Sequence, residues 1–177
     1  SSAYRVGIAH RRLSIIDLEE RAAQPMTSKD GRYVISFNGE IYNYRELRAK
    51  LEQKGYIFRT SSDTEVILYL YKDMGVDMFS ELRGMFAILL WDNYENKLLL
   101  ARDPYGIKPL YYSDDGLTLR AASQVKALLS GGKVSYKQEP AGLVGFYLFG
   151  SVPEPFTIYE GIRSLPASSY MYITNSG

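Results

Sequence analysis

The stretch Phe37-Asn38-Gly39-Glu40-Ile41-Tyr42-Asn43 decides how this chain is interpreted, because a predicted strand turns there into a predicted helix. Residues 32–37 alternate toward Asn38 as a half-buried strand does, and Asn43 can cap a helix that runs to about Lys54. Such a turn can place a side-chain amide next to a backbone N–H, and these are the two donors that an oxyanion hole needs. Taken alone, however, an Asn-Gly pair more often marks only a tight turn.

The pattern on both sides of this turn predicts short strands and helices. Before it, residues 6–9 and 13–16 have the apolar character of short strands, and the polar residues 18–31 are typical of a surface loop. After it, a second helix begins near Ser62 or Asp63, since either residue is a good cap. We expect this helix to stop at Gly75.

The middle of the chain changes to a strand pattern. Four apolar runs with turn residues between them predict an antiparallel meander over residues 85–91, 97–101, 110–112 and 117–121. Fully apolar strands are expected where both faces of a sheet are covered, so helices can cover one face and a second sheet the other. Short helices are expected at residues 123–129 and 141–149. Without repeats or linker-like stretches, the chain is predicted to form a single α+β domain over residues 1–177.

Composition excludes several classes of function. Lys and Arg total 21 and Asp and Glu total 20, and the resulting net charge of +1 argues against a nucleic-acid-binding surface. The chain has no cysteine and one histidine, His10, which excludes disulfides, thiolate metal sites and clustered-histidine metal sites within these residues. The longest apolar stretches are too short to span a membrane, and no leader opens the chain, so we expect a cytoplasmic location.

Four further motifs accompany the Asn38-Gly39 turn. In chain order they are His10-Arg11-Arg12-Leu13-Ser14-Ile15-Ile16-Asp17, Ser61-Ser62-Asp63-Thr64-Glu65-Val66, Gly84-Met85-Phe86-Ala87 and the stretch from Ala101-Arg102-Asp103-Pro104-Tyr105-Gly106 to Tyr112. Together they resemble the glutaminase domain, a class II glutamine amidotransferase, of the asparagine synthetase family. The stretch from Gly150 to Ile162 looks like the segment that leads toward the synthetase domain of that family.

The resemblance implies a fold and a reaction. The fold is a four-layer α-β-β-α sandwich of the N-terminal-nucleophile hydrolase type, which belongs to the α+β class. In the family, an N-terminal cysteine attacks the side-chain amide of glutamine, and its own α-amino group serves as the general base. This pairing is chemically reasonable because the α-amine and the thiol have similar pKa values.

The resemblance assigns three residues to two different ends of the substrate, the reacting side-chain amide and the α-carboxylate. Asn38 and the N–H of Gly39 match the oxyanion hole. Arg12 matches the residue that grips the α-carboxylate of the substrate, a task that suits a forked guanidinium. The competing structural interpretation of Arg12 is a surface cation.

Four more residues match the part of the pocket that receives the substrate's α-amino end. Asp63 matches the acceptor for the α-ammonium, and Glu40 lies beside it as a supporting contact. Ile15 and Ile16 match the segment that lines the pocket next to the arginine. The structural alternatives are that Asp63 only caps a helix and that Glu40 is an acidic residue favoured by the helix dipole.

Two other features are interpreted as structural. Arg102 and Asp103 precede a tight Pro-Gly turn and are predicted to form an ion pair that supports it. His10 is predicted to be a strand-end residue with no role in the site.

The chain departs from the family's pattern in three places. The cysteine-bearing strand that the family places first is missing, so we expect an N-terminally truncated domain that is poorly stable and inactive alone. Ser1 is the only terminal nucleophile available, but it lacks the glycine-containing strand of the family. Gln124 stands where the family usually has glutamate, and the nucleotide-binding Ser-Gly-Gly-x-Asp-Ser motif of the synthetase domain is absent.

The sequence therefore predicts the glutamine-binding part of an asparagine synthetase-like enzyme. The expected partners are L-glutamine and the C-terminal synthetase domain of the parent chain, with a homodimer left open and with no nucleic acid or membrane. No cofactor or metal is expected in this domain, whereas ATP and magnesium are expected in the synthetase domain. The alternatives are a glutaminase for another acceptor, such as an aminosugar or a peptide, and a nucleophile-free module that senses glutamine or mediates an interaction.

Overall fold

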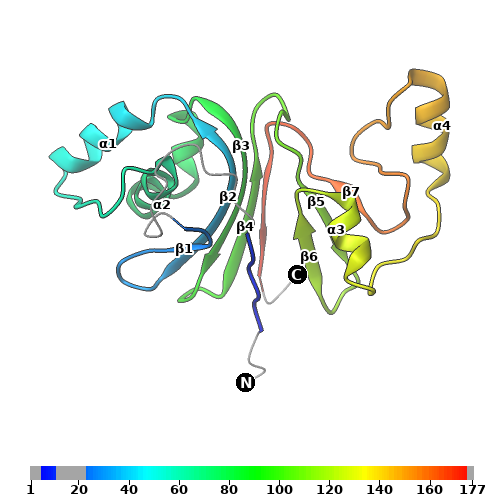
Figure 1. Cartoon of the computed structure of the whole chain (residues 1–177), viewed down its shortest axis with the longest axis horizontal. Coiled ribbons are helices and arrows are strands. Elements are labelled where there is room, and N and C mark those ends of the chain that lie inside the picture. The colour runs from blue at the N-terminus through cyan, green and yellow to red at the C-terminus, as the bar shows by residue number, and fades with distance from the viewer. Residues whose placement is uncertain (1–4, 11–22, 175–177) are drawn as a thin grey trace. The chain divides into compact units, whose positions relative to one another are not determined.

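The computed structural model describes residues 5–10 and 23–174, and these residues fall into two compact units. The first unit comprises Ser1–Leu100 with Met171–Gly177, and the second comprises Ala101–Tyr170. Figure 1 labels the helices and strands of both units. Each unit contains one sheet and its own helices, and each is described by itself.

The first unit is organised around a five-stranded sheet in the order β1-β2-β3-β4-β8. The strands are β1 (Met26–Thr27), β2 (Tyr33–Ile41), β3 (Gly84–Asp92), β4 (Lys97–Arg102) and β8 (Tyr170–Ile173). The longest pairing joins β2 and β3 in antiparallel register, from Tyr33 opposite Asp92 to Ile41 opposite Gly84. The predicted turn at Asn38-Gly39 is therefore wrong, because both residues lie inside β2, opposite Ala87 and Phe86, and the chain leaves the strand only after Ile41.

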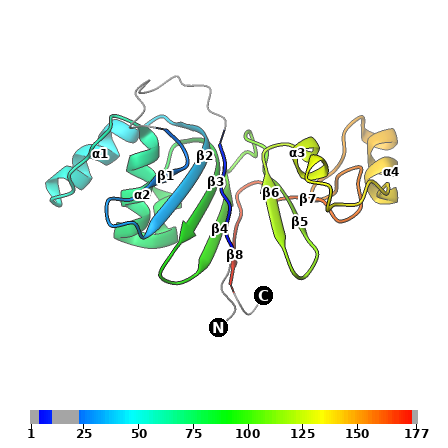
Figure 2. The same cartoon turned by 60° about the horizontal axis from the view of Figure 1, so that its bottom comes forward.

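Two helices cover one face of this sheet, as Figures 1 and 2 show. They are α1 (Tyr44–Gln53) and α2 (Asp63–Met74), and a 3-10 helix, η2 (Gly75–Ser80), follows α2. Ser62 caps α2 by accepting a hydrogen bond from the backbone N–H of Thr64, and Gly75 ends the helix with a φ of 60°, which glycine adopts easily. The predicted bounds of both helices are confirmed to within about one residue.

The start of α1 is held differently from the prediction. Asn43 precedes the helix, but its side chain makes no capping hydrogen bond to it. The Asn43 amide instead donates to the carbonyl oxygen of Glu81 at 2.9 Å and accepts from the N–H of Arg83 at 3.0 Å. Asn43 thus fastens the start of α1 to the segment that enters β3, a contact between residues distant in the sequence that local capping rules do not reveal.

The core of the first unit fills the space between the sheet and its helices. Side chains of β2 point into it at every second position, because successive side chains of a strand alternate between its faces. The most buried apolar residues of β2, α1, α2 and β3 in this core are Ile35, Phe37, Ile41, Leu47, Leu51, Val66, Ile67, Leu68, Ile88 and Leu90. Because these apolar side chains are buried under the helices, the side chains at the alternate positions of β2 lie on the opposite face of the sheet.

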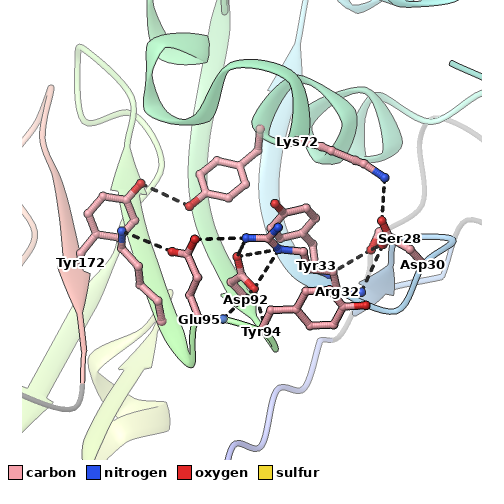
Figure 3. A network of polar contacts seen from close by, with 11 residues as sticks. Ser28, Asp30, Arg32, Tyr33, Lys72, Asp92, Tyr94, Glu95 and Tyr172 are labelled. Atoms are coloured by element: carbon pink, nitrogen blue, oxygen red, sulfur yellow. Dashed lines mark hydrogen bonds and ion pairs between the residues drawn. The ribbon is translucent and has the colours of Figure 1, made fainter. Parts of the chain in front are cut away.

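A network of polar contacts fixes the far end of the sheet (Figure 3). Arg32 donates to both carboxylate oxygens of Asp92, with the shortest contact at 2.7 Å, and Lys72 of α2 bonds to Asp30 at 2.6 Å. Burial alone would raise the pKa of Asp92, but hydrogen bonds from Arg32 and from two backbone N–H groups outweigh it and hold this pKa below its ordinary value. The network supports the β2–β3 register at the Tyr33–Asp92 end, opposite the end at which Ile41 pairs with Gly84.

The second unit contains a three-stranded sheet in the order β6-β5-β7. Its strands are β5 (Tyr111–Asp114), β6 (Leu119–Ala122) and β7 (Arg163–Ser164), and its helices are α3 (Val125–Ser130) and α4 (Pro140–Phe149). Leu128, Leu129, Val134 and Ile162 form its small core. The helices predicted at 123–129 and 141–149 are confirmed within one or two residues at each end.

Arg102 and Asp103 organise the loop that opens the second unit. The buried Arg102 guanidinium donates to the carbonyl oxygens of Gly106, Lys108 and Leu165, and forms an ion pair with Glu154. The Asp103 carboxylate accepts hydrogen bonds from three backbone N–H groups of the same loop, those of residues 105, 107 and 108. Both residues are structural, but the predicted ion pair between them is wrong, because Arg102 pairs with Glu154 and Asp103 binds backbone N–H groups. Each residue stabilises backbone that has no regular secondary structure.

Three local predictions need correction. Residues 18–31 are not all loop, because Met26 and Thr27 pair with β2 as the short strand β1. Residues 6–9 have no strand assignment, since an apolar run becomes a strand only where a partner offers backbone hydrogen bonds. The predicted meander is divided, with β3 and β4 in one sheet and β5 and β6 in the other. Residues 13–16 lie outside the described residues.

Within the described residues, no helix is long and apolar enough to cross a lipid bilayer.

Candidate functional site

The face of β2 opposite the helices carries the first candidate residues. Ile35, Phe37 and Ile41 are buried under the helices, so the alternating positions Asn38 and Glu40 lie on the other face, where both are half-buried. No described residue forms a hydrogen bond with the Asn38 amide. Among the described residues, the N–H donors of this half-buried side chain are not used.

Gly39 occupies a position that tolerates no side chain. It lies opposite Phe86 in the β2–β3 ladder, and a Cβ added to it would overlap the carbonyl oxygen of Met85. Gly84, opposite Ile41, has the same constraint, because a Cβ there would overlap the carbonyl oxygen of Glu40. The two glycines allow the backbones of β2 and β3 to approach closely beside Asn38.

Asp63 connects the first turn of α2 to the end of β2. It is the first residue of the helix and is only 5% exposed. Its Oδ2 atom accepts a hydrogen bond from the backbone N–H of Ile41 at 3.1 Å. The helix cap itself is Ser62, so the alternative in which Asp63 is only the cap does not describe the structure.

The surroundings of Asp63 raise its pKa. Burial is the largest cause, because it disfavours the charged carboxylate. Hydrogen bonds from the backbone N–H groups of Ile41 and Thr64 favour the charged form, whereas the nearby negative charge of Glu40 opposes it. A cation next to the Asp63 carboxylate would stabilise its charged form, because the cation would offset both the cost of burial and the repulsion from Glu40.

Gln24 is a residue of this site that the sequence interpretation missed. Its Oε1 atom accepts from the backbone N–H of Phe37 at 2.6 Å, and its Nε2 atom donates to the hydroxyl of Thr64 at 3.4 Å. Gln24 therefore joins β2 to the start of α2 at Thr64, the residue that follows Asp63. No local pattern announces this role, because the residue stands in a polar stretch that is typical of a loop.

His10 also lies at this face of β2. Its Nδ1 atom is 3.0 Å from the hydroxyl of Ser36, which alternates with Asn38 on the same side of the strand. His10 is thus a hydrogen-bonded structural residue, as predicted, although residues 6–9 before it do not form a strand. Arg12, Ile15 and Ile16 follow it directly in the sequence but lie outside the described residues, as Ser1 does.

Glu65 supports the site from within the helix. It is 1% exposed and accepts hydrogen bonds from the backbone N–H groups of Arg59 and Thr60 and from the Thr60 hydroxyl. It thereby orders the loop that precedes α2 and fixes where Asp63 begins the helix.

In the described parts of the chain, no group of three or more His, Cys, Asp or Glu residues is placed to hold a metal ion.

Comparisons with known proteins agree on one family. The family model described as "Glutamine amidotransferase domain" matches residues 1–177. Asparagine synthetase [glutamine-hydrolyzing] 1 of Bacillus subtilis (strain 168) is 44% identical over 172 residues, which cover 97% of this chain. The same match covers 27% of that relative, so this chain spans about a quarter of the relative's length.

Two solved structures have folds similar to that of this chain. One is titled the allosteric regulatory enzyme of purine biosynthesis, with a TM-score of 0.62 and 26% identity over 89% of this chain and 30% of that chain. The other is the glutamine phosphoribosylpyrophosphate amidotransferase of B. subtilis complexed with ADP and GMP, with a TM-score of 0.60 and 27% identity over 87% of this chain and 30% of that chain. The predicted fold class, α+β of the N-terminal-nucleophile hydrolase type, is confirmed by these neighbours.

Proposed function

The chain belongs to the glutamine amidotransferase family, and we propose that it is the glutamine-binding part of a longer, glutamine-hydrolysing asparagine synthetase. Glutamine is hydrolysed to glutamate and ammonia, and the ammonia passes to an ATP-activated aspartate in a synthetase portion outside these 177 residues. ATP and magnesium act in that portion, and this domain itself uses no cofactor. A cytoplasmic location is part of the same proposal.

The observation that carries the proposal is the bond between Asp63 and the end of β2. The bond from the Ile41 N–H to the Asp63 carboxylate places an acidic group beside the strand that carries Asn38 and Glu40. The α-ammonium of glutamine is the cation that would offset the burial of Asp63 and the charge of Glu40. Asp63 is therefore assigned to the amino end of the substrate.

The contact between His10 and Ser36 supports the assignment of Arg12. It fixes the chain on the Asn38 side of β2 only two residues before Arg12 in the sequence. A guanidinium at that point binds the α-carboxylate of glutamine with two parallel hydrogen bonds. Ile15 and Ile16, which follow, line the pocket beside it.

The chemistry takes place at the side-chain amide of glutamine. A cysteine thiolate from outside these residues attacks the amide carbon, and the carbonyl oxygen becomes an oxyanion that the Asn38 amide and the Gly39 N–H stabilise. Collapse of this intermediate breaks the C–N bond and releases ammonia, which takes up the proton that the thiol lost. Water then hydrolyses the thioester to glutamate. The 177 residues contain no cysteine, so hydrolysis requires the longer protein.

The test compares L-glutamine with glutaramate, the same molecule without its α-ammonium, by calorimetric titration of the longer protein with its nucleophilic cysteine replaced by alanine, so that glutamine is bound but not hydrolysed. The wild type should prefer glutamine by about 10- to 100-fold, the range expected for hydrogen bonds to a charged group. The Asp63→Asn variant should bind both ligands equally, and Glu40→Gln should reduce the preference less. A full preference in Asp63→Asn would remove Asp63 from the site.

Turnover assays on the longer protein with its cysteine intact separate the rival functions. Hydrolysis of glutamine without formation of asparagine from aspartate and ATP would indicate another acceptor, such as an aminosugar or a peptide. Binding of glutamine without any turnover would indicate a module that senses glutamine.

A further inference from the structure

Helix α4 exposes its large apolar side chains and buries its glycines. The two buried residues of Pro140–Phe149 are Gly142 and Gly145. Leu143 is partly buried, whereas five apolar side chains of the helix are at least half exposed: Val144, Phe146, Tyr147, Leu148 and Phe149. A surface helix ordinarily buries its apolar residues and exposes polar ones. In α4 the opposite is seen, because the large apolar side chains are exposed and the glycines are buried.

Close backbone packing explains why the glycines face inward. A Cβ added to Gly142 would overlap the carbonyl oxygen of Thr157, and a Cβ added to Gly145 would overlap the ring of Pro153. Residues 151–162 return along α4 in Figures 1 and 2, and the two glycines let this segment approach the helix axis. The inner face of α4 is therefore already occupied, and the helix cannot bury its aromatic residues by turning toward its own unit.

The composition of α4 indicates the class of surface that covers it. The helix contains no charged residue. Helices that lie on membrane surfaces carry Lys and Arg on their polar face, and α4 has none. Exposed Tyr and Phe side chains without charges are typical of the centre of a protein–protein interface. The uncharged, aromatic composition of α4 therefore favours an apolar protein surface as the partner that covers this helix.

We propose that the exposed face of α4 docks against the synthetase portion of the longer protein, an inference that rests on the proposed function. The relative with 44% identity matches 97% of this chain, including α4, and is more than three times as long as the match. A domain-sized remainder of the same polypeptide needs a contact surface on this domain, and α4 is an apolar one that its own unit leaves uncovered. The interface places Tyr147, Leu148 and Phe149 at its centre.

Thiol labelling of the longer protein tests this proposal. Single substitutions Leu148→Cys in α4 and Leu117→Cys in the β5–β6 turn provide a matched pair, because both leucines are highly exposed in this domain, at 70% and 96%. Labelling by a maleimide is measured at each site by mass spectrometry of the corresponding peptide. Position 148 should react about tenfold more slowly than position 117 in the longer protein, since a covered thiol is inaccessible to the reagent. A Val144→Cys variant repeats the measurement on the same face.

Each other outcome overturns the proposal. Equal labelling at positions 148 and 117 would mean that nothing covers α4. Protection that increases with protein concentration would assign the face to a second copy of the chain. Protection that appears only with phospholipid vesicles would assign it to a membrane. Glutamine hydrolysis is assayed on the same variants, so loss of the proposed function is distinguished from loss of the docking contact.

Discussion

The Asp63 carboxylate accepts the backbone N–H of Ile41 at 3.1 Å, so the first residue of α2 is hydrogen-bonded to the last residue of β2. This contact joins two motifs that are separated by 22 residues in the sequence. It holds the start of a helix beside the strand segment that contains Asn38, Gly39 and Glu40. The buried Asp63 carboxylate therefore helps to set the distance between the start of α2 and the candidate residues of β2, together with Gln24.

The hydrogen bond to Ile41 predicts different effects for two substitutions of Asp63. In Asp63→Asn the amide oxygen can still accept from the Ile41 N–H, so the free energy of unfolding should change little. In Asp63→Ala the buried N–H loses its acceptor, and the protein should be destabilised by about 1–3 kcal/mol. Urea denaturation measures both. Equal destabilisation by the two substitutions would show that the charge, not the hydrogen bond, holds the site together.

The raised pKa of Asp63 predicts a pH dependence of glutamine binding. The ionised carboxylate binds the α-ammonium, and burial keeps the pKa above its ordinary value of 3.8. As the pH falls through this raised pKa, Asp63 takes up a proton and the affinity for glutamine should decrease, at a pH above 3.8. Titration calorimetry across this range, on the longer protein with its nucleophilic cysteine replaced by alanine, measures the decrease. The Asp63→Asn variant should bind weakly and without this dependence, and a dependence that persisted in it would belong to another group.

The close approach of β2 and β3 predicts that Gly39 cannot be replaced. Gly39→Ala would push a Cβ into the carbonyl oxygen of Met85, and we expect a loss of about 1–3 kcal/mol or more in unfolding free energy. Gly7→Ala is the matched control, because the position has open space around it. Thermal unfolding should distinguish the two variants clearly. A Gly39→Ala protein as stable as the control would contradict the packing described for this strand pair.

The hydrogen bonds of Arg102 predict that lysine cannot replace it. The guanidinium donates to several carbonyl oxygens and pairs with Glu154, whereas an ammonium group cannot reach all of these acceptors. Arg102→Lys should lower the unfolding free energy by about 1.5–3 kcal/mol, the range for hydrogen bonds to a charged group. Arg45→Lys, on the exposed side of α1, should have a negligible effect. Chemical denaturation of both variants checks this, and equal stability would make the Arg102 contacts dispensable.

Local chemistry explains most of what the sequence could predict about the fold. Ser62 and Gly75 define α2 because a cap and a stop are properties of single residues and their neighbours. The continuous apolar run of residues 85–91 locates β3 for the same reason. Long-range pairing is different, and the strand formed by Met26 depends on Ile35 as its partner. Its polar surroundings indicate a loop until that partner is known.

The candidate site was predictable only in part for the same physical reason. The family resemblance pointed to Asn38, Gly39, Glu40 and Asp63, and the structure brings Asp63 next to the strand that carries the other three. The contact of Gln24 to both β2 and α2 was not predictable, because a side chain in a polar loop can bond to any exposed backbone group. The roles of Arg12, Ile15 and Ile16 remain predictions.

The steady-state rate of glutamine hydrolysis by an Asn38→Ala variant of the longer protein tests the central claim most directly. If the Asn38 amide stabilises the oxyanion, kcat should fall by about 100- to 1,000-fold while KM changes little, because the interaction forms only in the transition state. Asn43→Ala is the control in the same segment, since its amide bonds to Glu81 and Arg83 and should leave kcat nearly unchanged. A kcat of Asn38→Ala close to that of the wild type would contradict the assignment of the oxyanion hole and with it the proposed site.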